Sequence, residues 1–105
     1  MISKEEFINL INDFQNFDKK VSEVSDVLQV NFFESEICTY GFDMFTSYLK
    51  LLFNQDAVDD INWWLYDRDP DNPEPQMWQK IDDKKVAIST HTLDDLWNIV
   101  KDNRK

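Results

Sequence analysis

The sequence predicts a small α+β protein that is mainly α-helical, with four helices and a small antiparallel β-hairpin or three-stranded sheet. Three observations predict this fold. Apolar residues recur three or four positions apart in several long stretches, as on one face of a helix. One later stretch alternates apolar and polar residues on both sides of a polar turn, as in a hairpin. Breakers are few, because the chain has one glycine and its three prolines all lie between residues 70 and 75. The length of 105 residues predicts a single domain, residues 1–105.

The first helix is predicted for residues 4–28. Ser3-Lys4-Glu5-Glu6 has the pattern of a capping box, with serine at the N-cap and glutamate three residues later. The apolar residues that follow are spaced alternately three and four apart: Phe7, Leu10, Phe14, Phe17, Val21, Val24 and Leu28. Ile8 and Ile11 widen this stripe at its start. Such a stripe covers either the protein's own core or a second copy in a coiled coil. Phenylalanine fits a tight coiled-coil seam poorly, which favours the core; a homodimer through this helix is the alternative.

Two more helices are predicted in the middle of the chain. Residues 29–39 are ambiguous, since Val30 and Phe32 alternate with polar neighbours as in a short strand, and Gly41 is expected to mark a break. The second helix is predicted for residues 42–54. Its apolar face consists of Phe42, Phe45, Leu49, Leu52 and Phe53, flanked by Tyr48.

The third helix is predicted for residues 57–66, with Asp56 as its N-cap. Its buried stripe consists of Val58, Ile61, Trp64 and Leu65. Trp63 lies about 100° around this helix from Trp64. We therefore expect one of the two tryptophans in the core and the other at an edge or exposed.

A β-hairpin and a fourth helix complete the predicted fold. Residues 76–81 and 84–89 alternate in polarity around a turn at Asp82-Asp83-Lys84. Because an isolated hairpin is only marginally stable in water, we expect it to pack on the helices or on a third strand from residues 30–33. Thr92 and Asp95 have capping-box spacing, and the last helix follows with an apolar face of Leu93, Leu96, Trp97 and Val100.

Catalytic and metal-binding patterns are scarce. His91 and Cys38 are the only residues of their types, and they could meet only through the fold. One glycine cannot build a phosphate-binding loop. Asp67, Asp69 and Asp71 occupy the first, third and fifth positions of a calcium-loop pattern, but position six is not glycine and position twelve is a tryptophan rather than a glutamate. We therefore expect no enzymatic activity, no cofactor and no bound metal.

The charge of the chain limits its partners and its compartment. The net charge is −10, so phosphate backbones and anionic membranes repel the chain, and we expect neither direct nucleic-acid binding nor membrane binding. The lone Cys38 excludes an intramolecular disulfide and favours a reducing, cytoplasmic setting. The charged N-terminus lacks the apolar run of a signal peptide, and no stretch has the length of a membrane span.

The negative charge is concentrated between Asp56 and Asp83. This segment has nine acidic and two basic residues, a net charge of −7, and the other 77 residues contribute −3. To a basic groove such an array resembles a phosphate backbone, and an aromatic at its edge would supply an apolar anchor. The alternative is that the charge only keeps the protein soluble. The predicted partner-binding residues are Asp59, Asp60, Trp63, Tyr66, Asp67, Asp69, Asp71 and Glu74, with Trp63, Tyr66 or Trp78 as the anchor.

Two motifs stand out in the C-terminal half: Trp63-Trp64-Leu65-Tyr66, and Leu93-Asp94-Asp95-Leu96-Trp97. With the acidic proline-containing loop and the predicted hairpin between them, residues 59–101 resemble a loose family of small acidic proteins encoded by bacteriophages and prophages. The resemblance implies a phage accessory protein and carries over no site. Small acidic phage proteins often inhibit host nucleases, including CRISPR effectors, and some do so as DNA mimics.

The resulting hypothesis is a non-enzymatic, anti-CRISPR-like inhibitor. It would act in the bacterial cytoplasm by binding a basic nucleic-acid groove of a host nuclease. Two alternatives stay open: an antitoxin or immunity protein that blocks a toxin, and a structural, self-associating helical protein.

Overall fold

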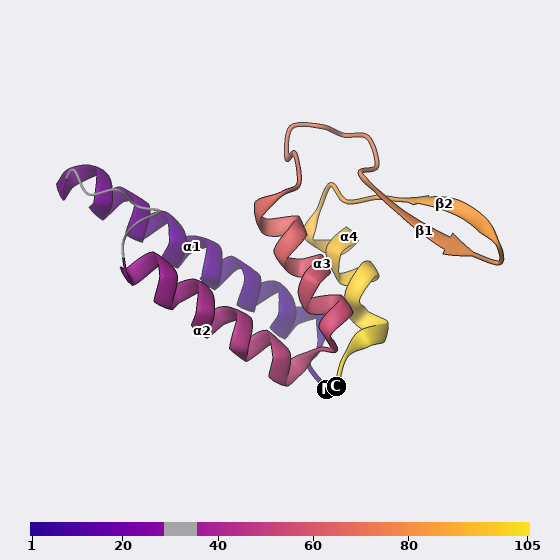
Figure 1. Ribbon diagram of the computed structural model, residues 1–105, viewed down its shortest axis with the longest axis horizontal. Helices are drawn as coiled ribbons and strands as arrows, with labels where there is room; N and C mark the ends of the chain where they lie inside the picture. Colours follow the sequence, from indigo (N-terminus) through magenta and orange to yellow (C-terminus); the bar gives the residue numbers. More distant parts are fainter. Residues whose placement is uncertain (29–35) are drawn as a thin grey trace. The chain divides into compact units, whose positions relative to one another are not determined.

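The computed structural model describes the backbone of residues 1–28 and 36–105 and the side chains of residues 1–20, 22–23 and 43–105. In this part of the chain it has four α-helices and a two-stranded antiparallel sheet, which confirms the mainly helical α+β fold (Figure 1). The elements are α1 (Lys4–Leu28), α2 (Glu36–Leu52), α3 (Gln55–Tyr66), β1 (Met77–Ile81), β2 (Lys84–Ile88), α4 (Leu93–Val100) and the 3-10 helix Lys101–Asn103. The chain divides into two compact units, residues 2–52 and residues 53–105 with Met1. That residues 1–105 form one domain stays a prediction.

In the unit formed by residues 2–52, α1 and α2 lie side by side (Figure 1). The predicted bounds of α1 and its capping box are confirmed: the Glu6 N–H donates to Ser3 Oγ, and the Ser3 N–H donates to Glu6 Oε1, both at 3.1 Å. The rings of Phe14 and Phe45 stack with centroids 3.9 Å apart. Helical packing of this kind orders both helices by burying their apolar faces.

The predicted stripe on α1 matches the buried face at its start but departs from it at Phe17. Phe7 and Ile11 are fully buried, whereas Phe17 is 49% exposed. At 3.6 residues per turn, Phe17 lies about 80° around the helix from Phe7, so a strict heptad stripe turns away from the buried face. The side chains at positions 21, 24 and 28 lie outside the described residues.

Two helix starts were predicted wrongly. The second helix begins at Glu36 rather than at residue 42, and Gly41 lies inside it. A single glycine costs a helix only about 1 kcal/mol, which neighbouring helical residues offset. The third helix begins at Gln55 with Asn54 at the N-cap, so Asp56 is not the cap but lies in the first turn, where the helix dipole favours a carboxylate. The strand considered for residues 30–33 lies outside the described residues.

In the unit formed by residues 53–105, α3 packs against α4. The Asn54 N–H donates to the Asn103 carbonyl at 2.8 Å, and Phe53 forms an isolated β-bridge with Arg104, so the start of α3 is joined to the last residues of the chain. The predicted capping box of α4 is confirmed, with the Asp95 N–H donating to Thr92 Oγ1. The buried apolar residues of this unit are Phe53, Ala57, Val58, Ile61, Trp64, Leu96, Trp97, Ile99 and Val100.

The hairpin and its turn are confirmed, but its expected cover is absent from the described part of the chain. Asp82 and Asp83 have φ values of 50° and 63°, the left-handed pair of a type I′ turn, which matches the twist of the strands. The sheet has two strands there, and it extends away from α3 and α4 (Figure 1). Trp78, Ile81 and Val86 are 54%, 47% and 38% exposed, so side chains on both faces of the hairpin reach solvent.

Candidate functional site

The outward face of α3 brings together three of the predicted site residues. Asp59, Trp63 and Tyr66 follow the spacing i, i+4, i+7, which places them on one side of a helix. Asp59 is exposed, Trp63 is half-buried and Tyr66 is 47% exposed. The opposite side carries Trp64, which is buried at 5% exposure. The prediction that one tryptophan of the pair is core and the other lies at an edge is therefore confirmed.

Asp60 lies at the flank of this face and fits a charge array less well. Its side chain is half-buried. Burial raises the pKa of the Asp60 carboxyl, and the nearby carboxylates of Asp56 and Asp59 raise it further. Because both effects disfavour the charged form, Asp60 is the weakest member of the predicted set.

Arg68, the one cation within the acidic loop, points inward rather than toward the aspartates. Its guanidinium stacks on the Trp64 ring at 3.8 Å, and its Nε donates to the Trp64 carbonyl at 3.3 Å. Its Nη1 donates to the carbonyls of Thr90 at 3.2 Å and His91 at 3.0 Å. Trp64 Nε1 also donates to the Thr90 carbonyl, at 3.0 Å. Burial lowers the pKa of Arg68, and the neighbouring Asp69 partly offsets this.

This arrangement gives Arg68 a structural role in the unit. The helix dipole places partial negative charge at the C-terminal end of α3, and the guanidinium compensates it there by bonding a terminal carbonyl. The same side chain fixes the segment before α4 to the end of α3. The guanidinium of Arg68 therefore lies on the inner side of the loop, where it contacts the Trp64 ring and backbone carbonyls.

The acidic loop, residues 67–76, is built from two consecutive turns. The Asp71 N–H donates to Asp69 Oδ1, and the Glu74 N–H donates to Asn72 Oδ1, both at 3.0 Å. Each bond spans a proline, whose fixed φ presets the turn. Asp and Asn favour this geometry because their short side chains reach the backbone two residues later.

Gln76 joins the two ends of the acidic loop. Its Oε1 accepts the Asp69 N–H at 2.9 Å, and its Nε2 donates to the Asp69 carbonyl at 2.7 Å and to the Asn72 carbonyl at 3.4 Å. The carboxamide thus satisfies both backbone groups of Asp69, as a neighbouring strand would. We call this set of bonds the Gln76 brace. It holds a polar loop without a hydrophobic core of its own.

The carboxylates of the acidic loop face solvent on this braced backbone. Asp67, Asp69, Asp71 and Glu74 are all exposed. Among the side chains that the structure describes, no basic group forms an ion pair with any of the four. An ion pair does occur on the hairpin, between Lys80 Nζ and Asp83 Oδ1 at 3.7 Å. The predicted loop residues thus form a fixed set of exposed carboxylates without an ion pair, within which only Asp69 lies close enough to Arg68 to interact with its charge and uses an oxygen to hold the loop.

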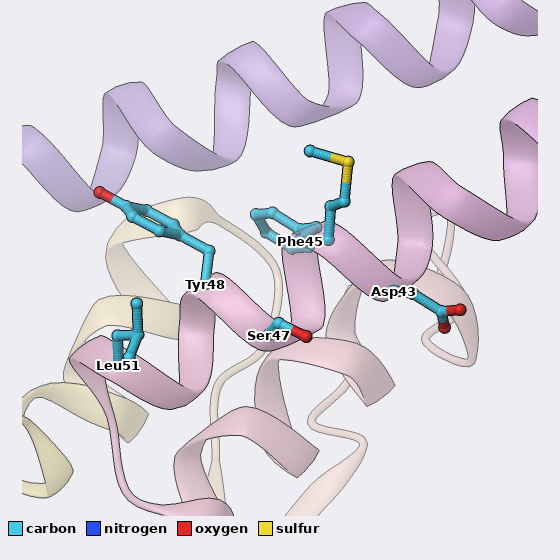
Figure 2. Close-up of a pocket in the computed structure, with 6 residues that line it drawn as sticks. Asp43, Phe45, Ser47, Tyr48 and Leu51 are labelled. Carbon is cyan, nitrogen blue, oxygen red and sulfur yellow. The ribbon is translucent and has the colours of Figure 1, made fainter.

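The other candidate sites among the described residues offer fewer groups that could bind a metal ion or react. In the part of the chain with described side chains, no three His, Cys, Asp or Glu residues are grouped so as to hold a metal ion. The backbone of His91 donates to Asp95 and accepts from Arg68, and the side chain of Cys38 lies outside the described residues. A depression on α2 is lined by Asp43, Met44, Phe45, Ser47, Tyr48 and Leu51 (Figure 2). Its lining is apolar apart from Ser47, Asp43 and the Tyr48 hydroxyl, and so lacks the converging polar groups of a catalytic pocket.

Comparison with known proteins gave no match. No protein-family model, no curated protein and no solved structure matches the chain. The likeness to small acidic phage proteins stays a resemblance of two motifs. None of the helices among residues 1–28 and 36–105 combines the length and the apolarity needed to cross a lipid bilayer.

Proposed function

We propose that this chain is a non-enzymatic, phage-type inhibitor that acts in the bacterial cytoplasm. It binds a basic nucleic-acid groove of a host defence nuclease, such as a CRISPR effector, and occupies that groove in place of nucleic acid. The observation that carries the proposal is the acidic loop. It displays four carboxylates on a braced backbone, while Arg68 is held on the inner side by Trp64 and two carbonyls.

The electrostatics of the loop fit this role. A groove that binds phosphates carries lysine and arginine with a layer of condensed or associated ions, and a fixed set of carboxylates can displace those ions as phosphates do. The attraction is strongest when no internal cation neutralises the carboxylates. Because the Gln76 brace already orders the loop, little conformational entropy is lost when a partner binds.

The outward face of α3 supplies the apolar part of the proposed interface. Tyr66 is the more exposed aromatic and serves as the anchor, with Trp63 beside it at the edge. Aromatic side chains of this kind often dominate the free energy of protein interfaces. In this assignment Asp59, Asp67, Asp69, Asp71 and Glu74 carry the charge, and Asp60 contributes least.

A charge-reversal experiment tests the proposal. The variant Asp67→Lys/Asp71→Lys/Glu74→Lys changes three exposed carboxylates that hold no bond of the loop. The matched control, Asp13→Lys/Asp43→Lys/Asp102→Lys, changes three exposed aspartates elsewhere. Each reversal adds +2, so both variants carry −4 instead of −10. Each protein competes with target DNA for purified CRISPR effector–guide RNA complexes in an electrophoretic mobility assay.

We expect the loop variant to compete roughly ten- to a hundredfold less well, since three charged contacts are reversed, and the control to keep most of its potency. Raising the salt concentration should weaken the wild-type complex, because exposed charges are screened over about 8 Å at physiological ionic strength. Equal losses in both variants would contradict a specific array. Absence of competition with every effector, together with tight binding to a basic toxin, would favour the antitoxin alternative.

A further inference from the structure

The hairpin has an open edge on β1. In a hairpin with a two-residue turn, the residues next to the turn exchange hydrogen bonds, and such pairs recur at every second position. Here these are Ile81↔Lys84, Gln79↔Val86 and Met77↔Ile88. The backbone N–H and C=O groups of Trp78 and Lys80 therefore point away from β2. In the described part of the chain, no other strand pairs with them.

The side chains along this edge are exposed and differ in charge from the rest of the molecule. Trp78 and Ile81 are 54% and 47% exposed. The Lys80 side chain is 75% exposed, and its cross-strand partner is a second cation, Lys85. Residues 77–88 contain three lysines and two aspartates, a net charge of +1 in a chain of net charge −10. Two copies can thus approach through their hairpins with less repulsion than through their acidic loops.

We infer that β1 pairs antiparallel with β1 of a second copy of this chain, with the two Gln79 residues opposite each other. The result is a four-stranded sheet in the order β2–β1–β1–β2. In this register Trp78 lies opposite Lys80 of the second copy, and Lys80 lies opposite Trp78 of the second copy. The outward backbone groups of these residues then meet and form the hydrogen-bonded pairs of the new ladder.

In this register the side chains that face each other across the interface are complementary in charge and polarity. Within one copy Lys80 lies beside Lys85 and pairs with Asp83 at 3.7 Å, and the ammonium group of Lys85 lies 5.1 Å from the centre of the Trp78 ring. In the dimer each Lys80 also lies beside the Trp78 ring of the second copy, which adds two cation–π contacts across the interface. On the other face of the sheet, Met77 lies beside Ile81 of the second copy, so two apolar pairs form.

Neighbouring registers match less well. A shift of one residue would turn the outward backbone groups of one strand away from those of the other. A shift of two in one direction places Lys80 opposite Lys80, where like charges repel. The opposite shift pairs Trp78 with Trp78, but it places Lys80 beside Gln76, whose carboxamide is already used in the Gln76 brace, and Met77 beside Gln79, so that the Lys80–Trp78 and Met77–Ile81 pairs are lost.

A cysteine placed on the symmetry axis tests the register. The two Gln79 residues would form a non-hydrogen-bonded pair with Cα atoms about 4.5 Å apart. This distance lies within the range of about 4.4–6.8 Å that a disulfide needs. In a Cys38→Ser background, mild oxidation of Gln79→Cys should give a disulfide-linked dimer on a non-reducing gel. The matched control is Val86→Cys, which lies on the same face but on the outer strand and should stay monomeric, although Val86 is itself 38% exposed.

An exchange of side chains tests the interface without a cross-link. Trp78→Lys places lysines opposite one another and should weaken dimerisation about tenfold, since two cation–π contacts become like-charge pairs. The double variant Trp78→Lys/Lys80→Trp rebuilds both pairs and should restore dimerisation, measured by analytical ultracentrifugation. Far-UV circular dichroism checks that each variant is folded.

Three results would overturn the inference. The first is a wild-type protein that stays monomeric at high concentration and whose Gln79→Cys variant does not cross-link. The second is equal cross-linking through Val86→Cys. The third is a dimer that is abolished by Phe17→Asp on α1 and unaffected by Trp78→Lys, which would show self-association through the first helix instead.

Discussion

Arg68 shows how one residue can have a role that its neighbours in the sequence do not suggest. It lies between Asp67 and Asp69 and is one of the two basic residues in the acidic segment. In the structure its guanidinium stacks on the Trp64 ring and donates to the carbonyls of Trp64, Thr90 and His91, and among the carboxylates of the loop only Asp69 interacts with its charge. Thr90 and His91 are 22 and 23 residues away, so no local pattern could identify them.

Replacing Arg68 by lysine should destabilise the fold although the charge is kept. A lysine cannot stack in a plane or bond two carbonyls with one fork, so we expect a loss of about 1–2 kcal/mol of unfolding free energy. Urea denaturation followed by circular dichroism measures this. The control is Arg104→Lys, whose guanidinium lies farther from its tryptophan, at 4.9 Å from Trp97, and should cost less. A wild-type midpoint for Arg68→Lys would contradict the assigned role.

Asp60 should limit stability at neutral pH. Its folded-state pKa is raised by burial and by two neighbouring carboxylates. A raised carboxyl pKa contributes stability that is complete below the unfolded value of about 3.9 and is lost as the pH rises through the folded value. Asp60→Asn should therefore be more stable than wild type at pH 7 by roughly 0.5 kcal/mol, a small figure because solvent screens a half-exposed group.

Measuring the stability of both proteins at acid pH tests whether the ionisation of Asp60 causes the difference. At about pH 3 the wild-type carboxyl is mostly protonated, so the gain from Asp60→Asn should disappear. Asp71→Asn removes the same charge from an exposed position and should change stability little at either pH. A gain from Asp60→Asn that persists unchanged at pH 3 would point to a cause other than ionisation.

At the scale of elements, the sequence was most informative where the determining contacts are local. Both capping boxes, at Ser3 and at Thr92, were predicted and are confirmed, because their donors and acceptors lie within four residues. The hairpin turn was predicted for the same reason. The start of α2 was predicted wrongly because Gly41 was given too much weight against the helical residues around it.

The type I′ turn offers a direct test of local strain. A residue with a β-carbon pays a steric cost in the left-handed region, about 1–2 kcal/mol, which glycine avoids. Asp83 has φ 63°, so Asp83→Gly should stabilise the protein by about 0.5 kcal/mol in thermal or urea unfolding, because the relieved steric cost exceeds the small contribution of its exposed ion pair with Lys80. Asp71→Gly, which also removes one exposed carboxylate, should be neutral or destabilising. Equal effects of the two substitutions would mean that charge, not backbone conformation, governs the result.

For the whole molecule, the sequence predicted where the charge lies but not how it is displayed. The order of charged residues along the chain is enough to locate the acidic segment between Asp56 and Asp83. The Gln76 brace and the inward position of Arg68 depend on which groups meet in space, and no spacing rule gives them. Packing of the hairpin on the helices was also expected, because isolated hairpins are only marginally stable, but among the described residues the hairpin extends away from α3 and α4; the third strand expected from residues 30–33 lies outside them.

Self-repulsion should make the stability of the whole chain depend on salt. At a net charge of −10, folding brings like charges together, and added salt screens them. We expect the melting temperature to rise between low and moderate sodium chloride, by about 4–8 °C for each kcal/mol of repulsion removed. The variant Asp67→Lys/Asp71→Lys/Glu74→Lys should melt higher at low salt and respond less. A salt-independent melting temperature would contradict substantial repulsion in the folded state.

In the acidic loop, different side chains hold the backbone and display the exposed charge, and this separation has an evolutionary consequence. Gln76, Asn72 and the Asp69 side chain hold the backbone, whereas the side chains of Asp67, Asp71 and Glu74 take no part in holding it. Substitutions at the latter three positions can accumulate singly at little risk to folding. Under the proposed function, the same braced backbone can therefore present different charge patterns to different basic partners while the shape of the loop is inherited unchanged.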